Sequence, residues 1–116
     1  MQYLLLIYEN EKNFAEMSES AKGELFAGYG AFTEELKAAG AMVGGNALET
    51  VDTATTVQVR NGETSKTDGP FAETKEQLGG YYLIDVENLD EATKWAAKIP
   101  TAKMGSIEVR PVMVFE

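Results

Sequence analysis

The sequence predicts a single α+β domain over residues 1–116, with a ferredoxin-like βαββαβ order and a β-hairpin insert. Three observations lead to this fold class. The chain opens on a short apolar strand, two later segments carry apolar residues at helical spacing, and an Asn-Gly pair joins two alternating strands. A chain of 116 residues has the usual size of one domain with its own core.

The opening strand, residues 2–8, is apolar on both of its faces. One face carries Leu4, Leu6 and Tyr8, and the other carries Tyr3, Leu5 and Ile7. A strand of this kind is covered on both sides, whereas the helices of a ferredoxin-like fold cover only one. We therefore expect a second copy of the chain on the free face, forming a homodimer that packs sheet to sheet.

The first long helix is expected from about Glu19 to Ala39. Ser18 is suited to cap its N-terminus, and Gly40 is suited to end it. One apolar face is formed by Leu25, Tyr29, Phe32 and Leu36, at spacings of four, three and four residues.

The middle of the chain is predicted to form strands and turns. An extended stretch around 41–51 precedes a strand at Thr55–Arg60, and Asn61-Gly62 predicts a hairpin that returns through Glu63–Asp68. A loop is expected over Gly69–Gln77.

The last third predicts a strand, a helix and a strand. The strand begins at Leu78 or Gly79 and ends at Val86. Asn88 and Glu91 form a capping box for the second helix, which Pro100 ends. The final strand is expected over Ser106–Phe115.

Composition excludes several kinds of chemistry. The chain has no cysteine and no histidine, so thiolate and imidazole mechanisms are impossible, and we expect neither a metal nor a cofactor. Ten Lys and Arg against 19 Asp and Glu give a formal charge of −9, which argues against nucleic acid and membrane surfaces as partners. The longest strongly apolar run, Tyr3–Tyr8, is too short for a membrane span or a signal peptide, and we expect a cytoplasmic protein.

A fifteen-residue stretch from Asp68 to Tyr82, DGPFAETKEQLGGYY, resembles the signature of the YCII-related family, in the branch named after its Asp-Gly-Pro-Phe (DGPF) motif. The resemblance continues through Tyr3–Tyr8, Tyr29–Phe32, Ala54–Val57, Leu83–Val86 and Gly105–Pro111. It implies a bacterial protein that forms a dimeric α+β barrel, with a role that is unassigned for most members. It also implies a setting beside extracytoplasmic-function sigma factors, and hence a sigma-factor-related partner.

One position departs from the family pattern. Many relatives carry histidine just before the glycine of the closing motif, and this chain has Met104 there. The resemblance therefore implies that any family chemistry that needs imidazole is absent here.

The DGPF motif holds the first candidate site residues. Asp68 before Gly69-Pro70 is typical of a turn, in which the carboxylate caps backbone amides and Phe71 fills the core. The alternative is a site in which Phe71 and the tyrosines desolvate Asp68, which then acts as a general base with Glu73 and Lys75 nearby.

The strands supply the other candidates. Glu108 and Arg110 share a face of the last strand, where they form a solvated ion pair or, if enclosed, Arg110 anchors a carboxylate or an enolate. Tyr81 and Tyr82 must point to opposite faces, one under a helix and one toward the space between the sheets of a dimer. Gly79-Gly80 indicates a bulge or a close backbone approach.

Three functions fit these residues. We favour a small-molecule-binding or regulatory homodimer, and the resemblance implies a link to an extracytoplasmic-function sigma factor. The first alternative is a cofactor-free isomerase or lyase that uses Asp68 as base and Arg110 with a tyrosine as oxyanion stabilisers. The second is a dimer whose motif is purely structural.

Overall fold

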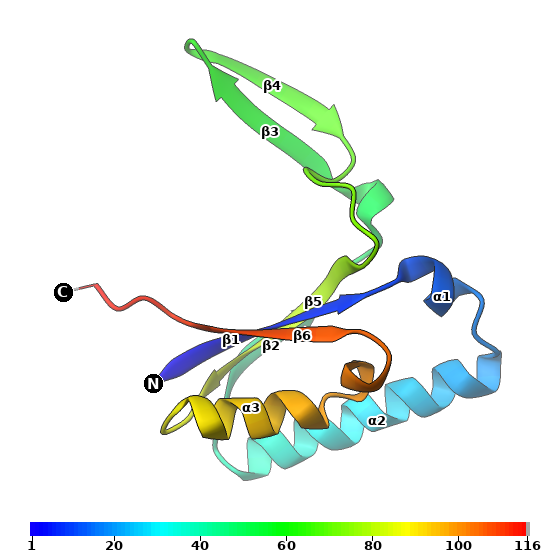
Figure 1. The fold of residues 1–116 in the computed structure, drawn as a ribbon, viewed down its shortest axis with the longest axis vertical. Helices are drawn as coiled ribbons and strands as arrows, with labels where there is room; N and C mark the ends of the chain where they lie inside the picture. The colour runs from blue at the N-terminus through cyan, green and yellow to red at the C-terminus, as the bar shows by residue number, and fades with distance from the viewer. Residues whose placement is uncertain (116) are drawn as a thin grey trace.

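A computed structural model describes residues 1–115 (Figure 1). Four strands form the main antiparallel sheet in the order β2-β5-β1-β6, and β3 and β4 form a separate two-stranded sheet. The elements are β1 (Gln2–Glu9), α1 (Glu11–Ala15), α2 (Glu19–Ala38), β2 (Met42–Ala47), η1 (Val51–Thr53), β3 (Thr55–Arg60), β4 (Glu63–Asp68), β5 (Gln77–Asp85), α3 (Leu89–Lys98), η2 (Pro100–Lys103) and β6 (Ser106–Pro111). The predicted α+β class is confirmed, and the order is compatible with a ferredoxin-like fold.

Helices α2 and α3 lie side by side on one face of the main sheet (Figure 1). The core between them and the sheet comprises Tyr3, Leu5, Ile7, Phe32, Leu36, Ala41, Ile84, Ala92, Ala96 and Ile99. The inward face of β1 is therefore the one that carries Tyr3, Leu5 and Ile7, as alternation along a strand requires.

The helix ends follow the capping residues read from the sequence. The Ser18 hydroxyl accepts a hydrogen bond from the Ala21 amide at 3.0 Å, and the Asn88 side chain accepts one from the Glu91 amide at 3.0 Å. Gly40, with φ of +71°, follows the end of α2 in the left-handed conformation that terminates helices.

The β3–β4 hairpin, residues 55–68, projects away from the main sheet, and we call it the arm (Figure 1). Asn61 and Gly62 both have positive φ, at 52° and 76°, as a two-residue hairpin turn requires. The predicted hairpin is confirmed. The arm gives the chain a radius of gyration of 16.2 Å, above the roughly 13 Å of a compact domain of this size.

The structure differs from the sequence prediction at the end of the last strand and in one additional helix. The last strand ends at Pro111 rather than at Phe115, because its neighbour β1 begins at Gln2 and the tail runs past that end. The Val112 amide still donates a hydrogen bond to the Gln2 carbonyl at 3.0 Å. Helix α1, which the sequence analysis missed, is a five-residue helix that begins at Glu11. Asn10 caps it, and the Asn10 side chain accepts hydrogen bonds from the amides of Lys12 and Asn13.

The opposite face of the main sheet, which we call the outer face, has no helix over it within residues 1–115 (Figure 1). Leu4, Leu6 and Tyr8 of β1 point to it and are each partly exposed. Val43, from β2, is 49% exposed. An apolar sheet face of this kind is a surface that a folded protein normally covers.

Candidate functional site

The DGPF motif lies where the arm joins the chain that leads to β5. The Gly69 amide donates a hydrogen bond to the Ala54 carbonyl at 2.7 Å, and the Thr56 hydroxyl donates one to the Gly69 carbonyl at 2.9 Å. Gly69 has φ of +102°, a conformation that glycine adopts without strain. The motif thus fixes the base of the arm.

Phe71 does not fill the core, as the sequence analysis expected of the turn. Its side chain is 81% exposed, and Asp68, Glu73 and Lys75 are exposed as well. Phe71 therefore does not desolvate Asp68 in this chain, because both side chains face solvent. Phe71 lies in the segment that joins the arm to β5, and this segment leaves its side chain outside the core.

Glu108 and Arg110 lie on the outer face of β6 and form an ion pair. They sit opposite Leu6 and Leu4 of β1, respectively. The side chain of Arg110 is 67% exposed, so the solvated pair is the arrangement found. Asp68 and Arg110 belong to different sheets, and the structure does not bring them together with Tyr82 around one cavity.

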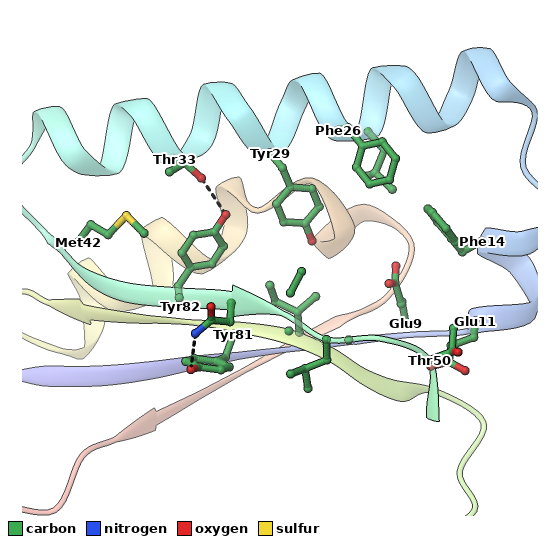
Figure 2. A pocket seen from close by; sticks show the side chains of 18 residues that line it. Glu9, Glu11, Phe14, Phe26, Tyr29, Thr33, Met42, Thr50, Tyr81 and Tyr82 are labelled. Carbon is green, nitrogen blue, oxygen red and sulfur yellow. Dashed lines mark hydrogen bonds between the residues drawn. The ribbon is translucent and has the colours of Figure 1, made fainter. Parts of the chain in front are cut away.

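The two adjacent tyrosines point to opposite faces, as predicted (Figure 2). The Tyr82 hydroxyl hydrogen-bonds the Thr33 hydroxyl of α2 at 2.9 Å, and its ring packs edge-on against Phe32. Tyr81 points to the outer face, where its hydroxyl accepts a hydrogen bond from the side-chain amide (Nδ2) of Asn46 at 2.9 Å.

A cleft of about 530 Å³ lies between α2 and the ends of β1, β2 and β5. Helix α1 closes one end of it (Figure 2). Its walls are largely apolar and include Phe14, Leu25, Phe26, Met42, Leu48 and Tyr82. Among the described residues that line it, the charged ones are Glu9 and Glu11. The volume lies in the range typical of small-molecule sites.

Glu9 and Tyr29 point into this cleft from opposite walls (Figure 2). Tyr29 comes from α2, and its hydroxyl hydrogen-bonds the Thr101 hydroxyl at 2.6 Å. Thr101 is fully buried, so this bond satisfies a polar group inside the core. Glu9 ends β1, two residues after Ile7, the strand's last inward apolar residue.

Burial raises the pKa of both groups. Partial burial is the larger cause for Glu9, and the negative charge of Glu11 raises its pKa further. For Tyr29, burial also dominates; the hydrogen bond with Thr101 lowers the pKa, and the charge of Glu9 raises it. Titratable groups perturbed in this way inside a cleft are typical of functional sites.

The glycine pair on β5, Gly79-Gly80, explains how the cleft accommodates the Glu9 carboxyl. The register of β5 against β1 shifts between Gly80 and Leu78, so Gly79 is the extra residue of a bulge, as predicted. A Cβ atom on Gly79 would lie 3.0 Å from Glu9 Oε1. A Cβ atom on Gly80 would lie 2.9 Å from the Asn46 carbonyl oxygen. Because Gly79 has no side chain, the Glu9 carboxyl can occupy the space beside it.

A comparison with protein families finds that the model of the YCII-related domain matches residues 1–116. The chain belongs to the YCII-related family. It is also similar to an uncharacterized protein of Rhizobium meliloti (strain 1021), which is 36% identical over 118 residues, covering 100% of this chain and 95% of that protein. Within the residues described for this YCII-related chain, we find no helix with both the length and the apolar character of a membrane span.

Sequence reasoning missed Glu9 and Tyr29 as site residues of this YCII-related chain. Tyr29 was read only as part of an apolar helix stripe, because helical spacing does not distinguish a core side chain from one beside a cleft. A signal existed for Glu9, which is the first charged residue after a six-residue apolar run. A carboxyl that continues a buried strand is often held near its apolar neighbours.

Replacing Glu9 with glutamine is expected to raise the thermal unfolding midpoint at about pH 7. The folded-state pKa of Glu9 lies above its ordinary value of 4.5, so ionised Glu9 opposes folding once the pH exceeds the raised pKa. Tyr29, Tyr82 and Glu11 face the same cleft, and none of them supplies a cation. Thermal unfolding of both proteins at about pH 7 and about pH 4 measures the effect, and the difference should shrink at the lower pH, where most of Glu9 is protonated in both the folded and the unfolded state.

The matched control is Glu34→Gln, an exposed carboxyl on α2 outside the cleft. It should leave the midpoint nearly unchanged at both pH values. A Glu9→Gln protein that is less stable than the parent at pH 7 would contradict the assignment of a destabilising carboxyl.

Proposed function

We propose that this YCII-related chain is a homodimer that binds a neutral, largely apolar small molecule in the cleft beneath α2. The observation that carries the proposal is the cleft itself: largely apolar walls line about 530 Å³, and two polar groups, Glu9 and Tyr29, point into it from opposite walls. This combination of an apolar body with few oriented polar groups is the usual character of a ligand site.

The charges of the cleft favour a neutral ligand. Glu9 and Glu11 both line it, and the whole chain carries a formal charge of −9, so an anion would be repelled. The exposed apolar surface favours an apolar ligand, because Phe26 is 60% exposed and Leu48 is 47% exposed at its rim. Covering these side chains would remove apolar area from water, at about 25 cal/mol per Å².

Binding can be measured with N-phenyl-1-naphthylamine, a neutral dye that fluoresces strongly in apolar surroundings. We expect the dye to bind the parent protein and Ala47→Trp to abolish binding, at least about a tenfold loss in affinity. Ala47 follows Gly45 by two residues on β2 and lines the cleft, so an indole at this position occupies the ligand space.

The control for this measurement is Ala38→Trp, which adds the same side chain at an exposed position of α2 outside the cleft. It should bind the dye as the parent does. Equal dye affinity in the Ala47→Trp and parent proteins would remove the cleft from consideration as the binding site.

The homodimer part of the proposal rests on surfaces outside the cleft. The outer face carries Leu4, Leu6 and Tyr8. On the arm, Val57 and Val59 are each more than half exposed. An isolated two-stranded hairpin is marginally stable in water. A second copy packed on the outer face and against the arm would cover both surfaces.

We also place the chain in the DGPF branch of the family, on the motif Asp68–Phe71. The hydrogen bonds of Gly69 at the base of the arm support a structural role for this motif. In a dimer, exposed Phe71 is available to pack on the second copy.

A further inference from the structure

We infer that the cleft is a proton-transfer site, in which Glu9 is the general base and the Tyr29 hydroxyl stabilises the oxygen anion formed on a neutral, planar carbon acid. The inference rests on the proposed function, because it assigns a reaction and a substrate class to the same cleft. The substrate class is a flat, conjugated molecule with an acidic C–H bond and an oxygen at the other end of its conjugated system.

The position of the Glu9 carboxyl suits it to act as the base. Glu9 points into the cleft beside the bulge residue Gly79, where a Cβ atom would lie only 3.0 Å from Glu9 Oε1. The carboxyl is half-buried among apolar walls and makes no salt bridge within residues 1–115. A carboxylate that is neither neutralised by a cation nor fully hydrated accepts a proton more readily than one in water.

The bond between Tyr29 and Thr101 allows the Tyr29 hydroxyl to act as the hydrogen-bond donor. Either hydroxyl of this 2.6 Å pair can be the donor. When the Thr101 hydroxyl donates to Tyr29 Oη, the phenol proton is free to point into the cleft. That phenol is protonated at neutral pH at its ordinary pKa of 10.0, and burial raises the pKa of Tyr29 further. A phenol held in this way can donate to an oxygen on which negative charge develops.

The planar shape of the substrate follows from the walls. Tyr29 reaches into the cleft from α2 and Tyr82 from β5, while Gly45, Gly79 and Gly80 leave patches of bare backbone among the side chains of the sheet wall. A flat molecule can lie against exposed backbone with its other face toward the aromatic rings.

The reaction balances without a cofactor. The Glu9 carboxylate takes a proton from carbon, and the C–H electron pair moves through the conjugated system to the terminal oxygen, which accepts a hydrogen bond from Tyr29. The protonated Glu9 then returns the same proton to a different carbon of the anion. The net change is the migration of one hydrogen and one double bond, with no oxidant or reductant.

The first step can be tested with 5-nitrobenzisoxazole, a neutral planar carbon acid. Its C–H proton goes to the base, the electron pair completes a nitrile, and the N–O bond breaks to release a coloured phenolate. We expect the full-length protein to accelerate this elimination, Glu9→Gln to lower the rate by at least about tenfold, and Tyr29→Phe to lower it by a smaller factor.

Two further variants and one binding measurement make the test decisive. Glu34→Gln, outside the cleft on α2, should keep the parent rate, and Glu9→Gln should still bind the neutral dye, which shows that the cleft is intact. A Glu9→Gln protein as fast as the parent, or loss of the rate in Asp68→Asn alone, overturns the inference. If the parent protein binds the dye but does not accelerate the elimination, the proton-transfer inference is overturned and the proposed function stands. If the parent protein does not bind the dye, the proposed function itself is refuted.

Discussion

Replacing Gly105 with alanine is expected to lower the free energy of unfolding by about 3 kcal/mol or more. A Cβ atom on Gly105 would lie 2.2 Å from the Tyr8 carbonyl oxygen and 3.0 Å from the Thr101 side chain. The first contact is with backbone in the central strand β1, which cannot rotate away as a flexible side chain can. The change therefore separates β6 from β1 at the point where their pairing begins, at Tyr8 and Ser106.

Urea unfolding measures this loss, and Gly23→Ala provides the matched control. Gly23 lies in α2, and a Cβ atom there meets nothing within 4 Å. The same substitution at this helical position should stabilise the protein by roughly 0.5–1 kcal/mol. Equal stabilities of the two variants would show that β1 and β6 do not approach each other as closely as described.

Replacing Leu6 with lysine is expected to convert the proposed dimer to a monomer. Leu6 lies at the middle of the outer face, between Tyr81 of β5 and Glu108 of β6. Lysine can pair with Glu108 in the monomer, so the fold should persist. In a dimer, by contrast, the ammonium group would be buried against the apolar face of the second copy, at a cost of several kcal/mol.

Analytical ultracentrifugation would show this as a fall from twice to once the chain mass of 12.6 kDa. Leu89→Lys is the control, since Leu89 is 52% exposed on α3, on the side of the sheet away from the outer face. It should leave the dimer intact. A monomeric parent protein, or a Leu6→Lys protein that remains dimeric, would show that the outer face is not the interface.

The fold could be predicted where local chemistry specifies it. Ser18 and Asn88 cap helices, and Asn61-Gly62 makes a turn, because each of these residues acts on backbone within a few positions of itself. The end of the last strand could not be predicted in the same way. Strand length depends on whether a neighbouring strand is present, and the apolar residues after Pro111 give no information about that.

The candidate site was harder to predict, because it depends on which surfaces meet. Phe71 is apolar, and its residue type alone favours burial, yet in the segment that follows the arm it is 81% exposed. Conversely, Glu9 looks like an ordinary strand-end charge until the bulge at Gly79 and the approach of α2 enclose it. The opposite orientations of Tyr81 and Tyr82 were predictable because strand alternation is local, whereas the choice of which one lines a cleft was not.

The position of β1 in the sheet has a consequence for synthesis of the protein. Tyr3 pairs with Ile84 on one side and Pro111 on the other. Strand β1 can therefore complete its pairing only after β5 and β6 have been synthesised. At about 5–20 residues per second, its apolar side chains wait roughly 5–20 s for their partners. The arm closes within microseconds of its own synthesis. Demand for chaperone protection on the ribosome is therefore concentrated in the opening residues of the chain.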